Sequence, residues 1–347
     1  MKITYYIHDL EFPLVEGVRK QAWWMAQEMK KKGHEVEILS TSKRKERVEK
    51  EAIKIKYGSA LDISKLCKTD LLHYVSHPSP LIVPLLLRAK AKVQVITPFD
   101  GGLNGFWKRS WDFLVSSLVL RRVSRVTLQT KYQFNLLQKT RLKIIQTKII
   151  PPLISNLKAS AKKSVEPTLL FMSHLSIEKG IGDVLKAFAI VREQKKGVKL
   201  IICDSGLKKN SFYYKEIKKI NREDIIIKGK VDPQEELSKA WIYLYPIHKA
   251  QETFSVPLSL IEAMQVNTKY ISTNVGGLAQ YFPEEYLIAP KRSDLLAAKI
   301  IEMLSPKSKI LPLIQKIDNK KTIQELERLY YELVKKKEES QIKNGIK

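Results

Sequence analysis

Residues 2–39 have the sequence KITYYIHDLEFPLVEGVRKQAWWMAQEMKKKGHEVEIL, and this stretch decides the class of fold. Lys2–His8 is rich in β-branched and aromatic side chains, which favours a strand. Apolar side chains recur at helical spacing from Val18 to Lys32, and Gly33 ends that helix. Glu35–Leu39 then has the pattern of a second strand. Strand, helix and strand in this order predict a βαβ unit, the beginning of a parallel sheet covered by helices.

The alternation of strands and helices is interrupted once. At Ile149–Pro167 two prolines are followed by a polar stretch rich in lysine and serine, which is typical of a linker. The alternation restarts at Thr168. The sequence therefore predicts an α/β protein with two doubly wound Rossmann-like domains facing a cleft. The expected parts are an N-terminal domain at 1–153, a linker at 154–167, a C-terminal domain at 168–318, and a C-terminal helix with a charged tail at 319–347.

Further elements are expected from the same periodicities. The strands lie at Leu71–Val75, Val93–Thr97, Thr168–Met172, Val198–Cys203, Ile225–Ile227, Tyr243–Tyr245 and Tyr270–Ser272. The helices lie at Gly182–Gln194, Pro257–Met264, Ser293–Leu304 and Thr322–Val334. The last of these helices has an apolar stripe that should pack on a domain, and the charged tail from about Lys335 is expected to be frayed.

Composition limits the classes of function. Of the 347 residues 44% are hydrophobic, which is enough for folded cores. Lys and Arg number 62 against 36 Asp and Glu, and the net charge of +26 attracts nucleic acid, anionic lipid or phosphorylated small molecules. Solvated helix faces explain the charge equally well, so charge alone does not identify a partner. No helix-turn-helix, zinc or RNP-like signature accompanies it, so no specific nucleic acid is expected.

Cysteine usage and the N-terminus bear on the compartment. Cys67 and Cys203 are far apart and have no neighbours at metal-ligand spacing, which favours a reducing compartment over a disulfide scaffold or zinc site. The sequence has no apolar run of the roughly 18–20 residues that a membrane span needs. Its start lacks the apolar stretch and cleavage site of a signal peptide. A cytoplasmic location is therefore expected.

The segment MSHLSIEKGIGDVLKAF, residues 172–188, joins the end of a strand to the start of a helix. Ser173, His174 and Lys179 lie where parallel strands deliver ligand-binding groups, and two glycines allow close approach of the backbone. A lysine here suits a diphosphate as a compact charge. An ordinary loop with a solvated lysine is the alternative.

The segment QETFSVPLSLIEAMQVNTKYISTNVGGLAQYF, residues 251–282, contains a second candidate site. Free N–H groups at the start of the helix Pro257–Met264 favour an anion. Glu262 is flanked by apolar residues, where an unpaired charge is costly, so its carboxylate needs a partner. A carboxylate at this position could accept hydrogen bonds from a ribose diol. A surface charge or a helix salt bridge is the alternative for Glu252 and Glu262.

Together these segments resemble the family-four retaining glycosyltransferases of the GT-B fold, also called glycosyl transferases group 1. The resemblance covers most of the chain, and the order and spacing of its segments make it specific. It is carried by EGVRKQAWWMAQEMKKKGHEVEIL (16–39), LLFMSHLSIEKG (169–180), IIIKGKVDPQEELSKAWIYLYPI (225–247) and ETFSVPLSLIEAM (252–264).

The resemblance implies a nucleotide-sugar donor held mainly by the C-terminal domain. Lys179 would hold the diphosphate, the backbone near Gly229 and Lys230 would meet the base, and Glu262 would bind the ribose. Glu252, with the backbone of Phe254–Val256, would address the donor sugar and phosphate. The donor-binding set implied in this way is Gly17, Arg19, Ser173, His174, Lys179, Gly229, Lys230, Phe254, Ser255, Val256 and Glu262.

The resemblance also implies the chemistry. A hexose would pass to a glycan or lipid-linked acceptor, bound on the side of the N-terminal domain, with retention of the anomeric configuration. Gly17 and Arg19 would close over the phosphates from that domain. Neither a metal nor a further cofactor is expected, in keeping with the lack of an Asp-x-Asp pair in a plausible loop. Positioning and charge would do most of the work, through Glu252, Asp100 and Lys179 as catalytic candidates.

The sequence departs from the family pattern at three places. Ser173 and His174 stand where the family has Gly-Arg, so a bidentate phosphate contact is replaced only in part. Nine residues separate Glu252 from Glu262, where the family has seven. In ITPFDGG, residues 96–102, a phenylalanine takes the place of the family's histidine. The following Asp100 is either a contact to donor or acceptor or a turn residue beside two glycines.

Residues 106–125, FWKRSWDFLVSSLVLRRVSR, combine aromatic, apolar and basic side chains. A basic amphipathic helix of this kind can lie in the interface of an anionic membrane. Family members that glycosylate lipid carriers often dock in this way, so a peripheral location at the inner face of the membrane is one interpretation. A core helix leading into the strand Val123–Leu128 is the other.

Two further functions stay open. One is a catalytically weakened binding or partner subunit, in which the changes at His174 and Phe99 have reduced the chemistry. The other is a sugar-nucleotide epimerase, which needs ionisable groups on both sides of the sugar ring. The candidates for those groups in the N-terminal domain are His8, His73, His77 and Asp100.

Overall fold

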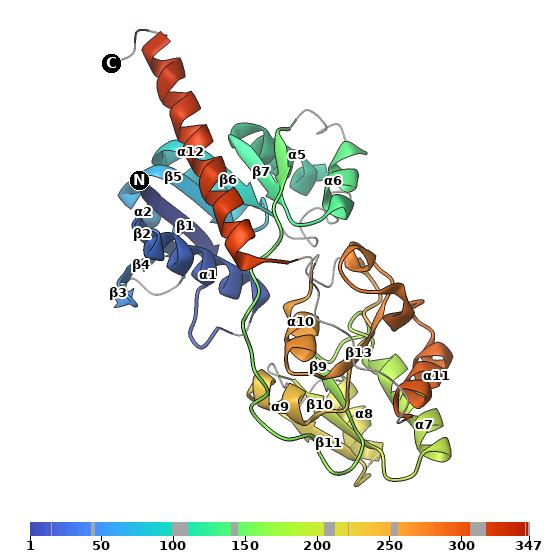
Figure 1. Ribbon diagram of the computed structural model, residues 1–347. Helices are drawn as coiled ribbons and strands as arrows, with labels where there is room; N and C mark the ends of the chain where they lie inside the picture. The colour runs from blue at the N-terminus through green and yellow to red at the C-terminus, as the bar shows by residue number, and fades with distance from the viewer. Residues whose placement is uncertain are drawn as a thin grey trace. The chain divides into compact units, whose positions relative to one another are not determined.

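The computed structural model describes residues 1–14, 16–42, 46–98, 110–139, 145–204, 212–220, 222–250, 256–305, 317–343 and 345. The chain divides into two compact units, one formed by Met1–Leu153 with Ile317–Lys347 and the other by Ile154–Lys316. Each unit is built on one mainly parallel sheet with helices on both of its faces (Figure 1). The prediction of an α/β protein with two doubly wound domains is therefore confirmed.

The sheet of the first unit has the strand order β3-β4-β2-β1-β5-β6-β7-β8. β1 and β2 are parallel neighbours, from Lys2 opposite Glu35 to His8 opposite Thr41, so the βαβ unit predicted at residues 2–39 is confirmed. β3 runs antiparallel to β4 at the edge. The strands are β1 (Lys2–His8), β2 (Glu35–Thr41), β3 (Arg47–Lys50), β4 (Ile53–Gly58), β5 (Lys68–Val75), β6 (Lys90–Thr97), β7 (Arg125–Leu128) and β8 (Thr147–Ile149).

Helices cover both faces of this sheet because side chains alternate along each strand. Tyr6 and Tyr74 belong to the apolar core on one face, whereas Tyr5 and His73 lie on the other. The helices in the first core are α2 (Ala60–Leu66), α3 (Val83–Arg88), α5 (Ser110–Arg122) and α6 (Lys131–Gln138). The opposite face carries α1 (Gly17–Lys31) and α12 (Asn319–Lys343), which lies against β5 and β6 (Figure 1).

Helix α12 shows where the structure departs from expectation. Its buried residues, Tyr330 and Leu333 among them, form the stripe expected within Thr322–Val334. The helix continues to Lys343, so the prediction of a frayed tail from Lys335 is wrong. Glu338 is 2.9 Å from Lys92 of β6, and pairs of opposite charge one turn apart support the rest of the helix.

His73 of β5 lies in a buried polar network between the sheet and α12. Its Nδ1 is 2.5 Å from the Tyr330 hydroxyl, and its Nε2 is 2.7 Å from the Thr97 hydroxyl. The Tyr5 hydroxyl lies 3.3 Å from that of Tyr330. Burial lowers the pKa of His73 to about 3, so the imidazole is neutral in the folded protein near neutral pH.

We expect His73 to make the first unit lose stability in acid. Between its unfolded pKa of 6.5 and its folded pKa of about 3, only the unfolded chain takes up the proton, so the free energy of unfolding falls as the pH falls. This contribution is about 1.4 kcal/mol per pH unit and is fully present above pH 6.5. Urea unfolding measured between about pH 7 and about pH 4 should show a shallower pH dependence for His73→Gln than for wild type. Equal slopes would contradict the prediction.

The sheet of the second unit has the order β11-β10-β9-β12-β13-β14, and its paired strands are parallel. α7 (Ile181–Gln194), α8 (Phe212–Ile220) and α11 (Ser293–Met303) share one apolar core with the sheet. α9 (Pro233–Lys239) and α10 (Leu258–Gln265) pack on the other face. The strands are β9 (Thr168–Met172), β10 (Lys199–Cys203), β11 (Ile225–Lys228), β12 (Ile242–Tyr245), β13 (Lys269–Thr273) and β14 (Leu287–Ile288).

Residues 154–167, predicted as a linker, form neither helix nor strand and are held along the second unit. The Lys163 ammonium donates to the Ala240 carbonyl at 2.6 Å, and the Trp241 indole donates to the Ser164 carbonyl at 2.8 Å. These contacts make the segment part of the packing of this unit.

None of the helices in the described ranges combines the length and the apolar composition that a membrane-spanning helix needs.

Candidate active site

The strand order of the second unit fixes where a ligand can bind. From β9 the chain first builds outward through β10 and β11, and then returns to place β12 and β13 on the other side of β9. The boundary between β9 and β12 is therefore the topological switch point, where loops at the carboxyl ends of the strands diverge and leave room for a ligand. Because these strands are parallel, the residues directly after β9, β10, β11 and β12 lie at the same edge of the sheet.

The loop after β9 contains the predicted phosphate lysine. The Lys179 N–H donates to the Ser176 hydroxyl at 3.3 Å, and the Gly180 N–H donates to the Ile177 carbonyl at 2.9 Å. Gly180 has φ +79°, and a Cβ on it would lie 2.0 Å from the Pro246 carbonyl oxygen. The backbone of this loop therefore packs directly on the loop after β12, across the switch point.

A histidine–carboxylate pair fastens these two loops together. His248 Nε2 is 2.6 Å from Asp183 Oδ2 in the first turn of α7, and both side chains are largely buried. The His248 N–H also donates to the Glu178 carbonyl at 2.8 Å. Sequence reasoning missed this pair, although a polar residue just past a strand end and an acid in the first turn of a helix are each a signal.

A second pair lies on the other side of β9. His174 Nδ1 is 3.3 Å from Oδ1 of Asp204, which is the residue directly after β10. The His174 side chain is 66% exposed, whereas that of Asp204 is 6% exposed. Ser173 and His174 are among the predicted site residues and Asp204 is not, although its position directly after a strand was an available signal.

Glu262 lies in α10 and is 4% exposed. Its carboxylate is close to Tyr243 of β12, whose pKa is raised by burial first and by the charges of Tyr245 and Glu262 in addition. The Tyr243 hydroxyl donates to the Ser259 hydroxyl at 3.0 Å on the same helix. Val256, just before the N-cap Pro257, is fully buried. The carboxylate is thus buried between α10 and β12, the strand that borders the switch point.

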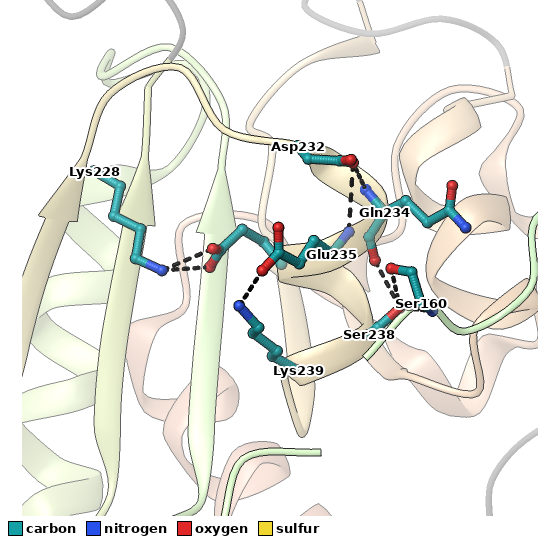
Figure 2. Close-up of polar contacts among 8 residues, drawn as sticks. Ser160, Lys228, Asp232, Gln234, Glu235, Ser238 and Lys239 are labelled. Atoms are coloured by element: carbon teal, nitrogen blue, oxygen red, sulfur yellow. Dashed lines mark hydrogen bonds and ion pairs between the residues drawn. The ribbon is translucent and has the colours of Figure 1, made fainter. Parts of the chain in front are cut away.

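The loop after β11, predicted to meet the base, is held at both ends. Lys228 pairs with both oxygens of the buried Glu236 carboxylate, at 2.7 and 2.8 Å. Asp232 caps α9 by accepting from the Gln234 N–H at 2.8 Å (Figure 2). Gly229 and Lys230 lie between these two anchors, and a Cβ on Gly229 would meet nothing within 4 Å. The backbone of Gly229 is therefore accessible to a flat ligand.

Gly17 and Arg19 belong to the first unit, where Gly17 begins α1. The Arg19 guanidinium lies 3.2 Å from Asp9, 3.6 Å from Glu16 and 3.9 Å from Glu11. Its positive charge is therefore already surrounded by carboxylates in this structure. The role predicted for these two residues over the phosphates stays a prediction.

Several predicted residues cannot be located. Asp100, Glu252, Phe254 and Ser255 lie outside the described residues, as do 106–109 of the basic aromatic segment. Of the histidines considered for an epimerase, His73 is completely buried against α12. It is therefore not available as a base to a sugar. In the part of the chain that the structure describes, no group of three or more His, Cys, Asp or Glu is arranged to hold a metal ion.

Comparison with known proteins identifies the architecture. Residues 155–324 match the family model described as glycosyl transferases group 1. Sucrose-phosphate synthase from Thermosynechococcus elongatus is similar with a TM-score of 0.77 and 16% identity, over 96% of this chain and 98% of that one. HepE from Anabaena, solved with UDP and glucose, has a TM-score of 0.72 and 15% identity, over 96% and 100% of the two chains.

A third similar structure is the pneumococcal O-GlcNAc transferase GtfA, solved with UDP and GlcNAc. Its TM-score is 0.75 at 12% identity, over 96% of this chain and 99% of that one. A search of curated proteins finds no match. At these identities the structures establish the fold, and the family model adds the sequence pattern of the second unit. The chain therefore belongs, through residues 155–324, to the glycosyl transferases group 1 family and has the GT-B glycosyltransferase fold.

Proposed function

We propose that the protein is a retaining, metal-independent glycosyltransferase that moves a hexose from a nucleotide-sugar donor to a glycan or lipid-linked acceptor. The observation that carries the proposal is the assembly at the switch point of the second unit. There the Lys179 loop packs on the loop after β12, and Glu262 is buried next to β12. The structures of HepE with UDP and glucose and of GtfA with UDP and GlcNAc support a nucleotide-sugar donor.

In the proposed mechanism, each group of residues at the carboxyl ends of the strands of the second unit binds a different part of the donor. Lys179 offsets the charge of the diphosphate, and the free N–H groups at the start of α10 add to it. Glu262 accepts hydrogen bonds from the ribose diol, and the backbone at Gly229 and Lys230 meets the base. The acceptor hydroxyl oxygen bonds to the anomeric carbon on the face from which the diphosphate oxygen leaves. The proton of that hydroxyl passes to the leaving diphosphate.

The direct test is nucleotide binding followed by transfer. Thermal unfolding is measured with UDP, ADP and GDP and with their hexose conjugates, and the best conjugate is then offered to candidate acceptors. A shift with one nucleotide and transfer of its sugar support the proposal. A shift without transfer or donor hydrolysis would favour the binding-subunit alternative, and no shift with any nucleotide would refute the proposed donor site.

We expect donor turnover to be insensitive to chelation. Lys179 and the start of α10 supply the positive charge that a divalent ion supplies in metal-dependent enzymes. Initial rates of sugar transfer with excess EDTA should stay within about twofold of those with added Mg²⁺ or Mn²⁺. Removing a catalytic metal would instead raise the activation free energy by several kcal/mol. Loss of activity in EDTA that added metal restores would refute metal independence.

A lipid-linked acceptor is favoured by the surface of α5. Leu114 and Leu118 are 60% and 45% exposed, and Arg121 and Arg122 continue the same exposed stripe. The opposite stripe, including Val115 and the fully buried Val119 and Leu120, packs in the core. The core interpretation of this segment therefore describes one face of the helix, and the membrane interpretation concerns the other. Exposed leucines beside arginines suit the interface of an anionic membrane, where each basic residue contributes about 1 kcal/mol.

Leu118→Glu is expected to weaken vesicle binding by on the order of tenfold, because a leucine that inserts into the interface contributes about 1.5–3 kcal/mol. Co-sedimentation with phosphatidylglycerol vesicles at low salt measures the effect. Leu295→Glu, at an exposed leucine of α11 in the second unit, is the control and should bind like wild type. Failure of the wild type to bind anionic vesicles would refute the membrane interface.

A further inference from the structure

Asp204 and His174 lie just past the carboxyl ends of two adjacent strands: Asp204 directly follows β10, and His174 is the second residue after β9. β9 and β10 are parallel, with Met172 opposite Cys203. The ladder continues past both strands, since the Ser173 N–H donates to the Cys203 carbonyl at 3.1 Å and the Asp204 N–H donates to the Lys228 carbonyl at 3.1 Å. The sheet therefore sets the backbone positions of Asp204 and Ser173, and His174 is the next residue along the chain.

The carboxylate and the imidazole differ sharply in burial. The Asp204 side chain is 6% exposed and that of His174 is 66% exposed, with 3.3 Å between Oδ1 and Nδ1. A buried carboxylate is stable only when hydrogen-bond donors or positive charges face it. When Nδ1 is the atom that faces Asp204, it must carry a proton, and the opposite nitrogen, Nε2, is directed away from the carboxylate.

This arrangement has a consequence for charge at the switch point. An imidazole that carries a proton on both ring nitrogens can donate to a carboxylate through one nitrogen and to a second anion through the other. The imidazole lies on the same β9–α7 connection as Lys179, at the end of the central strand. A protonated nitrogen there would donate a charge-assisted hydrogen bond to a phosphate oxygen, the stronger kind of hydrogen bond.

We propose that Asp204 is a positioning residue for donor binding: it holds His174 with Nδ1–H on the carboxylate, so that in the nucleotide complex Nε2–H donates to an oxygen of the donor diphosphate. This inference rests on the proposed function and adds a residue to it. Asp204 does not touch the donor; it acts through His174. The pair lies at the ends of β9 and β10, next to the switch point between β9 and β12.

A double-mutant cycle tests the coupling. The probe is whichever of UDP, ADP and GDP gives the largest thermal shift, and its Kd is measured by calorimetry for wild type, His174→Gln, Asp204→Asn and the double variant. Each single change is expected to weaken binding on the order of tenfold, the worth of one hydrogen bond to a charged group. The double variant should bind no more weakly than either single variant, since both remove the same contact.

Arginine at position 174 provides the rescue. Its guanidinium is always charged, so it needs no carboxylate to hold a proton. Asp204→Asn should therefore cost less than roughly threefold in a His174→Arg background, against roughly tenfold in the wild-type background. Glu236→Gln, which also removes a buried carboxylate of this unit, is the matched control. The factor by which Glu236→Gln changes the Kd for nucleotide should be the same in the wild-type and in the His174→Gln background.

The outcomes separate the inference from the proposed function. Additive losses for His174→Gln and Asp204→Asn, in a wild type that binds nucleotide, overturn the inference alone. A wild type that binds no nucleoside diphosphate overturns both. If Asp204→Asn does not fold, the ¹⁵N spectrum of histidine-labelled wild type with bound nucleotide decides: the inference requires protons on both ring nitrogens of His174, and a bare Nδ1 or Nε2 overturns it.

Discussion

Gly180→Ala is expected to destabilise the second unit by about 3 kcal/mol and to abolish nucleotide binding with it. An alanine at φ +79° costs about 1–2 kcal/mol because of its left-handed backbone. Its Cβ would lie 2.0 Å from the Pro246 carbonyl oxygen, and relieving such a clash costs roughly a further 1–3 kcal/mol. The neighbouring Lys179 would move with the displaced loop, so the predicted diphosphate contact would be lost together with stability.

Gly182→Ala, two residues along the same chain, is the matched control. A Cβ at this position meets nothing within 4 Å, and the residue lies in the first turn of α7. Alanine favours a helix over glycine by about 1 kcal/mol, so this variant should be as stable as wild type or more so. Urea unfolding of the three proteins measures both effects. Equal stabilities for Gly180→Ala and wild type would show that the two loops do not pack on each other as described.

Glu262→Ala is expected to weaken nucleotide binding on the order of 100-fold, since two hydrogen bonds from the ribose to a carboxylate contribute about 1.5 kcal/mol each. At a nucleotide concentration about 100 times the wild-type Kd, wild type should gain about 2.7 kcal/mol of stability. The variant should gain only about 0.4 kcal/mol. Thermal unfolding with and without nucleotide gives both numbers. Because each protein is compared with its own ligand-free form, any effect of the mutation on the stability of the ligand-free protein cancels.

Ser259→Ala is the control for Glu262→Ala. It lies on the same helix, and it removes the hydroxyl that accepts from Tyr243 at 3.0 Å without removing a carboxylate. The packing of α10 on β12 is therefore perturbed, but the charge stays. Nucleotide should stabilise Ser259→Ala as much as wild type. If Ser259→Ala lost the ligand response to the same extent as Glu262→Ala, the effect would belong to the helix and not to the carboxylate.

Much of the fold could be predicted because its signals are local. The strand Lys2–His8 and the strand Thr168–Met172 agree with the structure residue for residue. Buried parallel strands are apolar runs bounded by turns, and amphipathic helices have apolar residues at helical spacing. Both patterns can therefore be recognised within a short stretch of sequence. The edge strand β3 and its neighbour β4 were missed. β3 is exposed throughout and charged, so it has no hydrophobic pattern to detect.

The end of the chain shows the limit of local signals. The apolar stripe of α12 could be recognised from the sequence, but its extension to Lys343 could not, because residues 335–341 are all polar or charged. The salt bridge from Lys92 that accompanies the extension joins residues that are 246 positions apart. The assignment of α12 to the first unit likewise depends on Tyr330 meeting His73 and Tyr5, which no periodicity predicts.

The sequence by itself determined the alternation of strands and helices, the two sheets, and the positions of Lys179, His174, Gly229 and Glu262 relative to strand ends and helix starts. Those features depend on side-chain patterns within a few residues. Only the tertiary structure decided that His174 meets Asp204 and that His248 meets Asp183. These partners are separated by 30 and 65 residues. They are brought together by the order of strands in the sheet, which is set by the packing of the whole unit.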